Sequence, residues 1–264
     1  MADIFEREAK AIAKLSDCLS HNILPLFRQK NGKPELVGSS FLVSSAADNY
    51  LISAAHVFDE LAQGNELFFY IKPTITAKLS GELRRTKVPN EKDRNHDRLD
   101  IGVLKLDKSI NPPYLGVQKY PVPIEALIPN ALPRDGKHYL LVGFPETKSR
   151  INPVAKELKS KLYSFRNTSA PAIKYHELGL DASSHIVMNF QIRRTVSPNK
   201  EIRTFPKPQG MSGSPVWLLY EEDGSNDPSQ TPIVGVLIEY YSSKKALVAT
   251  DIGIALKLIH GKQR

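Results

Sequence analysis

Most of the chain consists of short segments in which apolar and polar residues alternate, separated by residues that favour turns. A period of two is typical of β-strands, and Asn31-Gly32 between two such segments predicts a hairpin, because both residues tolerate positive φ. In the first part of the chain the predicted strands are residues 24–29, 34–43, 50–54, 66–71 and 101–106. In the second part they are residues 138–143, 185–192, 214–220, 232–240 and 246–250. Many short strands without a longer repeat predict an all-β protein with closed sheets.

Helical periodicity is found only towards the two ends of the chain. Residues 3–20 carry an apolar stripe with a period near 3.6, formed by Ile4, Ala11, Ile12, Leu15 and Leu19. We expect this helix to pack on the outside of a barrel, with Cys18 in its core-facing side, and the alternative is a docking element for a partner. Residues 252–260 predict a terminal helix.

Proline-rich sequence divides the chain into two halves. Residues 111–136 contain Pro112, Pro113, Pro121, Pro123 and Pro133, which favour an irregular connection over a strand. The predicted organisation is therefore an N-terminal helix at 1–22, a first barrel at 23–110, a connection at 111–136, and a second barrel with the C-terminal helix at 137–264.

Composition and charge bear on whether the protein binds nucleic acid. The 264 residues are 41% hydrophobic, as in ordinary globular proteins, with a formal net charge of +8 and a pI of about 9.4. The densest basic run is interrupted by Glu146 and Glu157, which favours a solvated face over a nucleic-acid site. That run consists of Lys148, Arg150, Lys156, Lys159, Lys161 and Arg166. We therefore expect no nucleic-acid partner beyond weak binding to polyanions.

The cysteine count and the first residues predict a cytoplasmic location. Cys18 is the single cysteine, so no disulfide can form within the chain. Acidic residues among the first eight positions do not fit a signal peptide, and no apolar run reaches the ~18 residues of a membrane span. The remaining histidines have no paired spacing that would bind a metal.

The segment Gly210-Met211-Ser212-Gly213-Ser214-Pro215 carries the strongest chemical signal. A serine between glycines is open to attack on a carbonyl, and free backbone amides beside it can bind an oxyanion. His56 follows the apolar run 50–52, and Asp100 begins the run 101–106. The order His56, Asp100, Ser212 matches one of the known arrangements of a Ser-His-Asp triad. Asp97 is the competitor for the acid, but it precedes the charged Arg98 rather than an apolar strand.

At five motifs the chain resembles the trypsin/chymotrypsin-like serine peptidases, and most closely their disulfide-free bacterial branch. These motifs are Gly38-Ser39-Ser40-Phe41, Ser53-Ala54-Ala55-His56, Asp100-Ile101-Gly102-Val103-Leu104, Val142-Gly143-Phe144-Pro145 and Gly210 to Pro215. The resemblance implies a chymotrypsin-like double barrel, with two six-stranded-type β-barrels and the active site between them. It also implies a bacterial serine endopeptidase that needs no metal or organic cofactor.

The same resemblance assigns roles to single residues. His56 would be the general base, Asp100 its orienting acid and Ser212 the nucleophile, with the Gly210 and Ser212 amides forming the oxyanion hole. Residues framing the substrate pocket would be Pro206, Gln209, Ile238 and Glu239. Pro206 stands where trypsin-like enzymes carry an Asp that binds basic side chains, which disfavours a trypsin-type pocket. The weak expectation is therefore apolar or small substrate residues, and the alternative is an acidic pocket if Glu239 or Asp251 points inward.

Met211 departs from the family pattern. Secreted relatives carry an Asp there, which pairs with a new N-terminus after zymogen cleavage. A methionine cannot form that ion pair, so we expect control by another route, such as a regulatory protein partner. The substrate would be a protein or peptide. The alternative is a catalytically silent double barrel that binds peptide or protein partners.

Overall fold

The computed structural model of the protein describes residues 2–46, 48–72, 75–88, 94, 97–110, 119–130, 132–152, 157–190, 195–196, 202–203, 205–221 and 225–261. Of these, residues 2–9, 62, 150–152, 157–159, 195–196 and 202–203 are described by their backbone alone.

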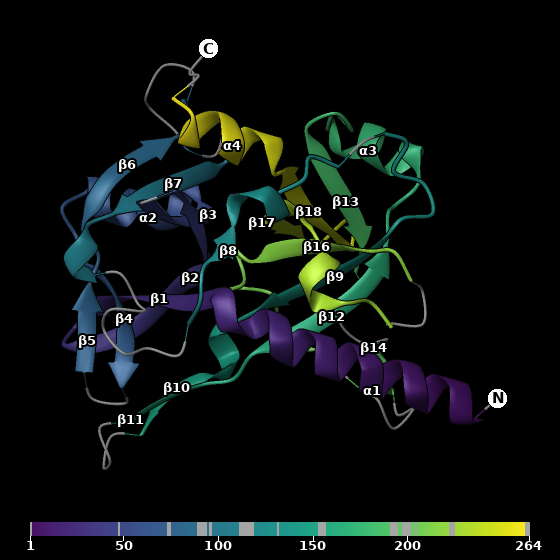
Figure 1. Ribbon diagram of the computed structural model, residues 1–264, viewed down its shortest axis with the longest axis horizontal. Coiled ribbons are helices and arrows are strands. Elements are labelled where there is room, and N and C mark those ends of the chain that lie inside the picture. Colours follow the sequence, from purple (N-terminus) through teal and green to yellow (C-terminus); the bar gives the residue numbers. More distant parts are fainter. Residues whose placement is uncertain are drawn as a thin grey trace.

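Two curled antiparallel sheets form the molecule, one from each half of the chain (Figure 1). The first has the order β5-β4-β1-β2-β3-β7-β6, with β8 pairing in parallel with β2. Its strands are β1 (Ile23–Lys30), β2 (Lys33–Ser45), β3 (Asp48–Ala54), β4 (Leu67–Lys72), β5 (Ile75–Lys78), β6 (Gly81–Arg85), β7 (Ile101–Leu106) and β8 (Val122–Pro123). The predicted hairpin at Asn31-Gly32 joins β1 to β2, and both of its residues have positive φ.

The second sheet has the order β12-β9-β16-β17-β18-β13. Its strands are β9 (His138–Gly143), β12 (Tyr163–Thr168), β13 (His185–Asn189), β16 (Pro215–Leu219), β17 (Ile233–Tyr241) and β18 (Ala246–Asp251). Two separate hairpins pair β10 (Ser149–Asn152) with β11 (Glu157–Ser160), and β14 (Thr195–Val196) with β15 (Ile202–Arg203). The predicted all-β fold with two barrel-like halves is confirmed.

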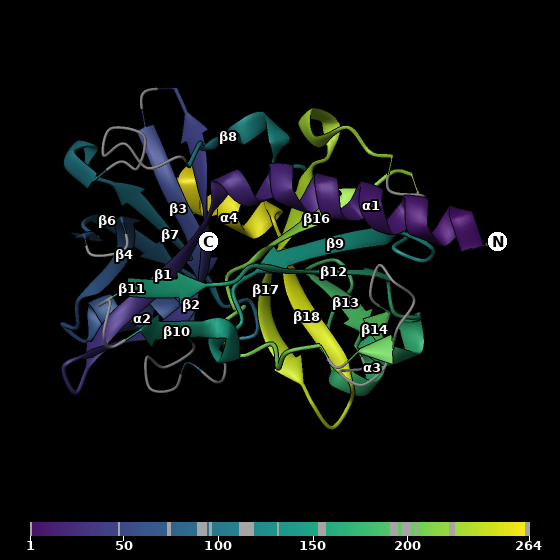
Figure 2. The same ribbon diagram turned by 90° about the horizontal axis from the view of Figure 1, so that it is seen from below.

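The predicted terminal helices are α1 (Ala2–Leu19) and α4 (Gly253–Ile259). Leu15 and Leu19 are buried, whereas Cys18 is exposed, so the expectation that Cys18 belongs to the core is wrong. It stands one residue before Leu19, and neighbouring positions on a helix face different directions. Figures 1 and 2 show α1 extending from the junction of the two sheets alongside β9. The side chain of Ile4 lies outside the described ones.

Two short helices inside the chain were not predicted: α2 (Ala55–Ala62) and α3 (Ala172–Leu178). α2 and α4 both pack on β7, which is why β7 is buried at five of its six residues instead of alternating. α4 belongs to the second half of the chain but covers the first sheet, and Arg84 of β6 donates to the carbonyls of Leu258 and Ile259. The two halves are therefore joined by packing and hydrogen bonds.

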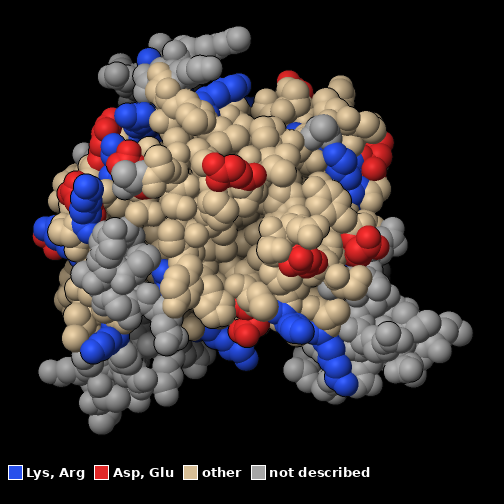
Figure 3. Space-filling view, viewed as in Figure 1, with Lys and Arg blue, Asp and Glu red and all other residues tan. Residues whose placement is uncertain are grey.

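On the face shown in Figure 3, uncharged residues cover most of the middle, isolated acidic side chains lie within it, and lysine and arginine lie mainly towards the edges. Lysine and arginine alternate there with aspartate and glutamate, and the described side chains form no continuous basic stripe on that face. Within the described part of the chain, we find no helix both long and apolar enough to cross a membrane.

Candidate active site

His56 is held by Asp100 through two hydrogen bonds. It lies in the first turn of α2, directly after β3, so its backbone amide is not yet used by the helix. That amide donates to Asp100 Oδ1 over 2.9 Å, and Nδ1 of the ring lies 2.5 Å from Asp100 Oδ2. The carboxylate therefore fixes both the backbone and the ring of His56.

Asp97, the competing acid, has other partners. Its Oδ2 accepts from Arg94 over 2.6 Å and from the Thr86 hydroxyl over 2.5 Å, and its Oδ1 accepts from the Leu99 amide. Arg94 in turn donates to Asp59 of α2. This network anchors the loop before β7, while Asp100 alone of the two acids reaches His56.

Residues of the second sheet also form hydrogen bonds with the loop before β7. Thr250 of β18 donates to the Leu99 carbonyl over 2.7 Å, and Nε2 of the His185 ring lies 2.9 Å from the Arg98 carbonyl. Asp100 itself has a φ of 45°, in the left-handed region that few non-glycine residues adopt and that Asp tolerates better than most. Contacts from both halves of the molecule thus hold the Asp100 side chain under His56.

Opposing effects set the pKa of His56. Partial burial of the imidazole lowers it, but the hydrogen bond and the negative charge of Asp100 outweigh that effect and raise the pKa above its usual value. The His56 side chain is 40% exposed, while that of Asp100 is 11% exposed. Asp100 consequently favours the protonated imidazolium, the form that a general base becomes during proton transfer.

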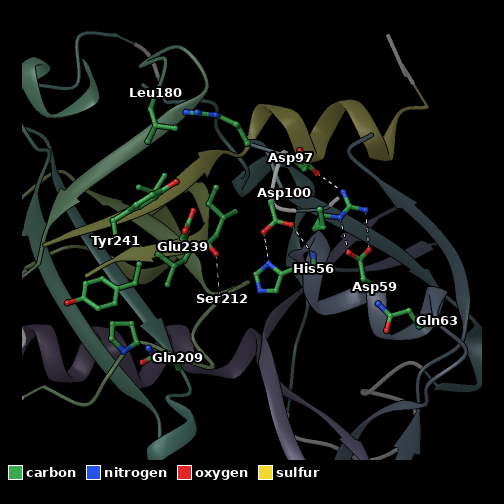
Figure 4. A pocket seen from close by; sticks show the side chains of 17 residues that line it. His56, Asp59, Gln63, Asp97, Asp100, Leu180, Gln209, Ser212, Glu239 and Tyr241 are labelled. Atoms are coloured by element: carbon green, nitrogen blue, oxygen red, sulfur yellow. Dashed lines mark hydrogen bonds and ion pairs between the residues drawn. The ribbon is translucent and has the colours of Figure 1, made fainter. Parts of the chain in front are cut away.

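Ser212 comes from the second half of the chain and faces His56. Figure 4 shows the His56 ring between Asp100 and Ser212. The Ser212 hydroxyl lies 3.4 Å from the Ile238 carbonyl of β17, and the Ser212 carbonyl accepts from the Ser39 amide over 2.8 Å. A Cβ on Gly38 would lie 2.5 Å from Val57 Cγ2 of α2 and 3.0 Å from that carbonyl, so a glycine leaves room for both neighbours.

The loop before Ser212 is a turn that requires glycine. Met211 donates to the Pro208 carbonyl over 2.9 Å, and Gly210 has a φ of +85°, as expected at the third position of a type II turn. The Gln209 carbonyl accepts from the Glu146 amide over 2.8 Å. The Gly210 and Ser212 amides, predicted to form an oxyanion hole, donate no hydrogen bond to another described residue.

Met211 is fully buried in the second hydrophobic cluster, which also contains Leu141, Phe205 and Leu237. The position that holds an Asp in secreted trypsin-like enzymes is therefore an apolar one in this protein.

A cavity of about 630 Å³ contains His56, Asp100 and Ser212 together. Of the predicted substrate-binding residues, Gln209, Ile238 and Glu239 line it, whereas Pro206 is buried and is not among its lining residues. Pro206 comes two residues before the turn that begins at Pro208 and directly follows Phe205, which packs in the second hydrophobic cluster.

Several lining residues were not identified from the sequence: Asp59, Gln63, Arg94, Arg98, Leu180, Tyr240 and Tyr241. A helix after His56 would have placed Asp59 one turn beyond it, but the others come from distant segments. Burial, followed by a hydrogen bond to Glu239, raises the pKa of Tyr241 to about 12, so its hydroxyl stays protonated near neutral pH. In the described part of the chain, no three His, Cys, Asp or Glu residues are grouped so that they could hold a metal ion.

Comparison with known proteins gives a structural match. No family model and no curated sequence matches the chain. Among solved structures, the mouse brain serine protease neuropsin superposes with a TM-score of 0.58 at 16% identity, over 92% of this chain and 94% of that one. At this identity the match establishes the fold, which is the chymotrypsin-like double barrel.

Proposed function

We propose that the protein is a serine endopeptidase that hydrolyses peptide bonds through an acyl-enzyme. One observation carries the proposal: the His56 ring, bound through Nδ1 to Asp100, lies next to Ser212 in a cavity between the two sheets. A nucleophile, a base and a group that orients the base are the three parts such chemistry needs.

In the first half of the reaction, the Ser212 oxygen forms a bond to the substrate carbonyl carbon while His56 Nε2 takes the hydroxyl proton. The Gly210 and Ser212 amides donate to the oxyanion, each contributing roughly 10² to 10³ in rate. The C–N bond then breaks, and the imidazolium gives its proton to the leaving amine. Water attacks the ester by the same steps and regenerates the Ser212 hydroxyl.

The Ser212 hydroxyl must turn from the Ile238 carbonyl to His56 for this reaction. The Ser212 hydroxyl and the Ile238 carbonyl are 3.4 Å apart, which is long for an O–H···O hydrogen bond. Little free energy therefore opposes rotation of the hydroxyl. Hydrogen bonds at an active site often tighten only once substrate is bound.

We further propose that Glu239 favours a basic side chain in the substrate. It lies one residue beyond Ile238, whose carbonyl contacts the Ser212 hydroxyl. The other lining carboxylates have partners of their own: Asp59 and Asp97 pair with Arg94, and Asp100 binds the His56 ring. Among the described residues, Glu239 has no cationic partner, so a lysine or arginine of the substrate could pair with it in the cavity. This takes up the alternative in which Glu239 points inward and makes the pocket acidic, in place of the weak expectation of apolar or small residues.

Cleavage of a peptide series that varies one residue at a time tests this preference. We expect basic residues at one position to raise kcat/KM about 5-fold, since an ion pair in a cleft is worth on the order of 1 kcal/mol. Glu239→Gln should remove the preference, and Glu221→Gln, an exposed carboxylate outside the cavity, should keep it. An unchanged preference in Glu239→Gln would exclude Glu239 as its source.

We also propose that the protein works in a reducing compartment, the cytoplasm. A chain with one exposed cysteine holds its two sheets together without an internal disulfide, which suits the cytoplasm. A bacterial origin and a regulatory protein partner stay predictions.

A fluorophosphonate probe tests the function itself. We expect it to label one residue, Ser212, and expect Ser212→Ala to abolish labelling and peptide cleavage while leaving the thermal unfolding temperature nearly unchanged. Ser242→Ala, which removes an exposed hydroxyl in the turn after β17, is the matched control and should label normally.

A folded wild-type protein that neither labels nor cleaves peptides would contradict the proposal. Tight binding of peptides by that inert protein would favour the silent binding module instead. Labelling that persists in Ser212→Ala would place the nucleophile elsewhere.

A further inference from the structure

Ser39 of β2 connects the first sheet to the loop that precedes Ser212. Its hydroxyl donates to the Gly210 carbonyl over 3.0 Å and accepts from the Phe144 amide over 3.0 Å. Its own amide donates to the Ser212 carbonyl, and its carbonyl accepts from the Ser53 hydroxyl. Ser39 is fully buried, so every one of these groups is satisfied within the protein.

The loop carrying Gly210 is fixed at two consecutive carbonyls. The Glu146 amide binds the Gln209 carbonyl, and the Ser39 hydroxyl binds the Gly210 carbonyl. In a planar trans peptide the C=O and N–H point in opposite directions. The N–H of Gly210 therefore points away from residue 146. Gln209, which precedes Gly210, and Ser212, two residues beyond it, both line the cavity.

We propose that Ser39, together with the Glu146 amide, is a positioning residue that keeps the Gly210 amide turned towards the oxyanion. This inference rests on the proposed peptidase function and deepens it, because it names what orders the loop. Met211 is buried among apolar residues and offers no charge to anchor it. A neutral hydroxyl from the opposite sheet does this, so the loop is ordered as soon as the two sheets are assembled.

Without the Ser39 hydroxyl, the Gly210 carbonyl and the Phe144 amide would lose their buried partner. Buried backbone groups rarely remain unpaired, so we expect the turn to rotate until each finds another partner. The freed carbonyl belongs to the peptide between Gly210 and Met211, so its rotation would leave the adjoining Gln209–Gly210 peptide held by the Glu146 amide alone. We expect the Gly210 amide then to lose its fixed orientation towards the oxyanion. Loss of one oxyanion donor slows acylation by roughly 10² to 10³.

The test compares Ser39→Ala with Ser40→Ala. Ser40 is the matched control, because its hydroxyl is also fully buried but donates to the Leu24 carbonyl within the first sheet. We expect Ser39→Ala to lower the rate constant of fluorophosphonate labelling, and kcat for a peptide, by at least 10-fold. KM and the affinity of a product peptide should change less than 3-fold, and Ser40→Ala should label at the wild-type rate after correction for any unfolded fraction.

A second pair of variants tests the loop if Ser39→Ala does not fold. Glu146 is exposed at the first position of a short helix (Glu146–Lys148), where proline is well tolerated. Glu146→Pro removes the N–H that binds Gln209, whereas Glu146→Ala keeps it. We expect Glu146→Pro to lower kcat at least 10-fold with KM nearly unchanged, and Glu146→Ala to behave as wild type.

The outcomes separate this inference from the proposed function. An inert wild-type protein would contradict the peptidase proposal, and this inference with it. An active wild-type protein whose folded Ser39→Ala variant keeps the wild-type kcat would overturn the role of Ser39 alone. Equal rates for Glu146→Pro and Glu146→Ala would overturn the role of the Glu146 amide.

Discussion

His56 and Asp100 form the pair from which the pH dependence of the protein follows. Asp100 raises the pKa of His56 by stabilising the imidazolium. The unfolded chain lacks this contact, so its histidine titrates near the usual value of about 6.5. The pair's contribution to folding stability is therefore fully present below that value and is lost as the pH rises through the raised pKa. The proposed catalysis needs neutral His56, so we expect activity to change in the opposite direction across the same window.

We expect kcat/KM to fall on acidification with a midpoint above the usual pKa of histidine. Asp100→Asn should move this midpoint to lower pH, because the charge that favours the imidazolium is gone. It should also lower kcat by about 10⁴, as loss of the orienting carboxylate does in such triads. Rates measured from pH 5 to 9 check both effects.

Asp97→Asn is the control for this experiment, since Asp97 binds Arg94 and Thr86 instead of His56. It should lower the unfolding temperature but leave the midpoint of the pH profile unchanged. A midpoint that moves with Asp97 and stays constant in Asp100→Asn would reverse the assignment of the acid.

At the scale of elements, the sequence predicted the parts whose signal is local. The buried strands β2, β3, β7 and β16 to β18 carry clear apolar runs between turn residues. α2 and α3 have eight and seven residues, shorter than the window in which a period of 3.6 stands out. β5 has mostly exposed residues, so its sequence lacks the alternation of a half-buried strand. These elements are stabilised by strand pairing and helix packing with their neighbours in the fold, which their own sequences do not reveal.

The same limit applies to the site. His56, Asp100 and Ser212 could be identified because each lies in a short motif with its own chemistry. Arg94 and Tyr241 reach the cavity because segments distant in the sequence come together in the fold. No local sequence pattern predicts such contacts. The bond from the Glu146 amide to the Gln209 carbonyl joins backbone groups, and so does not depend on side-chain identity.

At the scale of the whole molecule, the site exists only where the two sheets meet. His56 follows β3 and Asp100 precedes β7, and both strands belong to the first sheet. Ser212 precedes β16 of the second sheet. Ser39, Thr250 and Arg84 each donate a hydrogen bond from one half of the chain to the other. Formation of the site is therefore coupled to assembly of the two halves, and this coupling needs no disulfide between them.

This architecture leads to a last prediction, that activity does not depend on a newly cut N-terminus. An α-amine could order the Gly210 loop only by pairing with a buried carboxylate, and the buried side chain there is Met211. A chain with a short tag before Met1 should therefore match the untagged chain in kcat and in active-site titration. Mass spectrometry of the labelled protein should find it uncut.

Cleavage near residues 20 to 35 should reduce activity. β1 (Ile23–Lys30) lies between β4 and β2, and Leu15 and Leu19 anchor the preceding helix in the core. A cut there would remove α1 and leave β1 with a free end, at a cost of roughly 2 to 5 kcal/mol for each buried leucine lost. An intact chain that is inert until it is cut in this segment, with the freed amine beside the Gly210 loop, would show that the loop is ordered by the new terminus and not by Ser39 and Glu146.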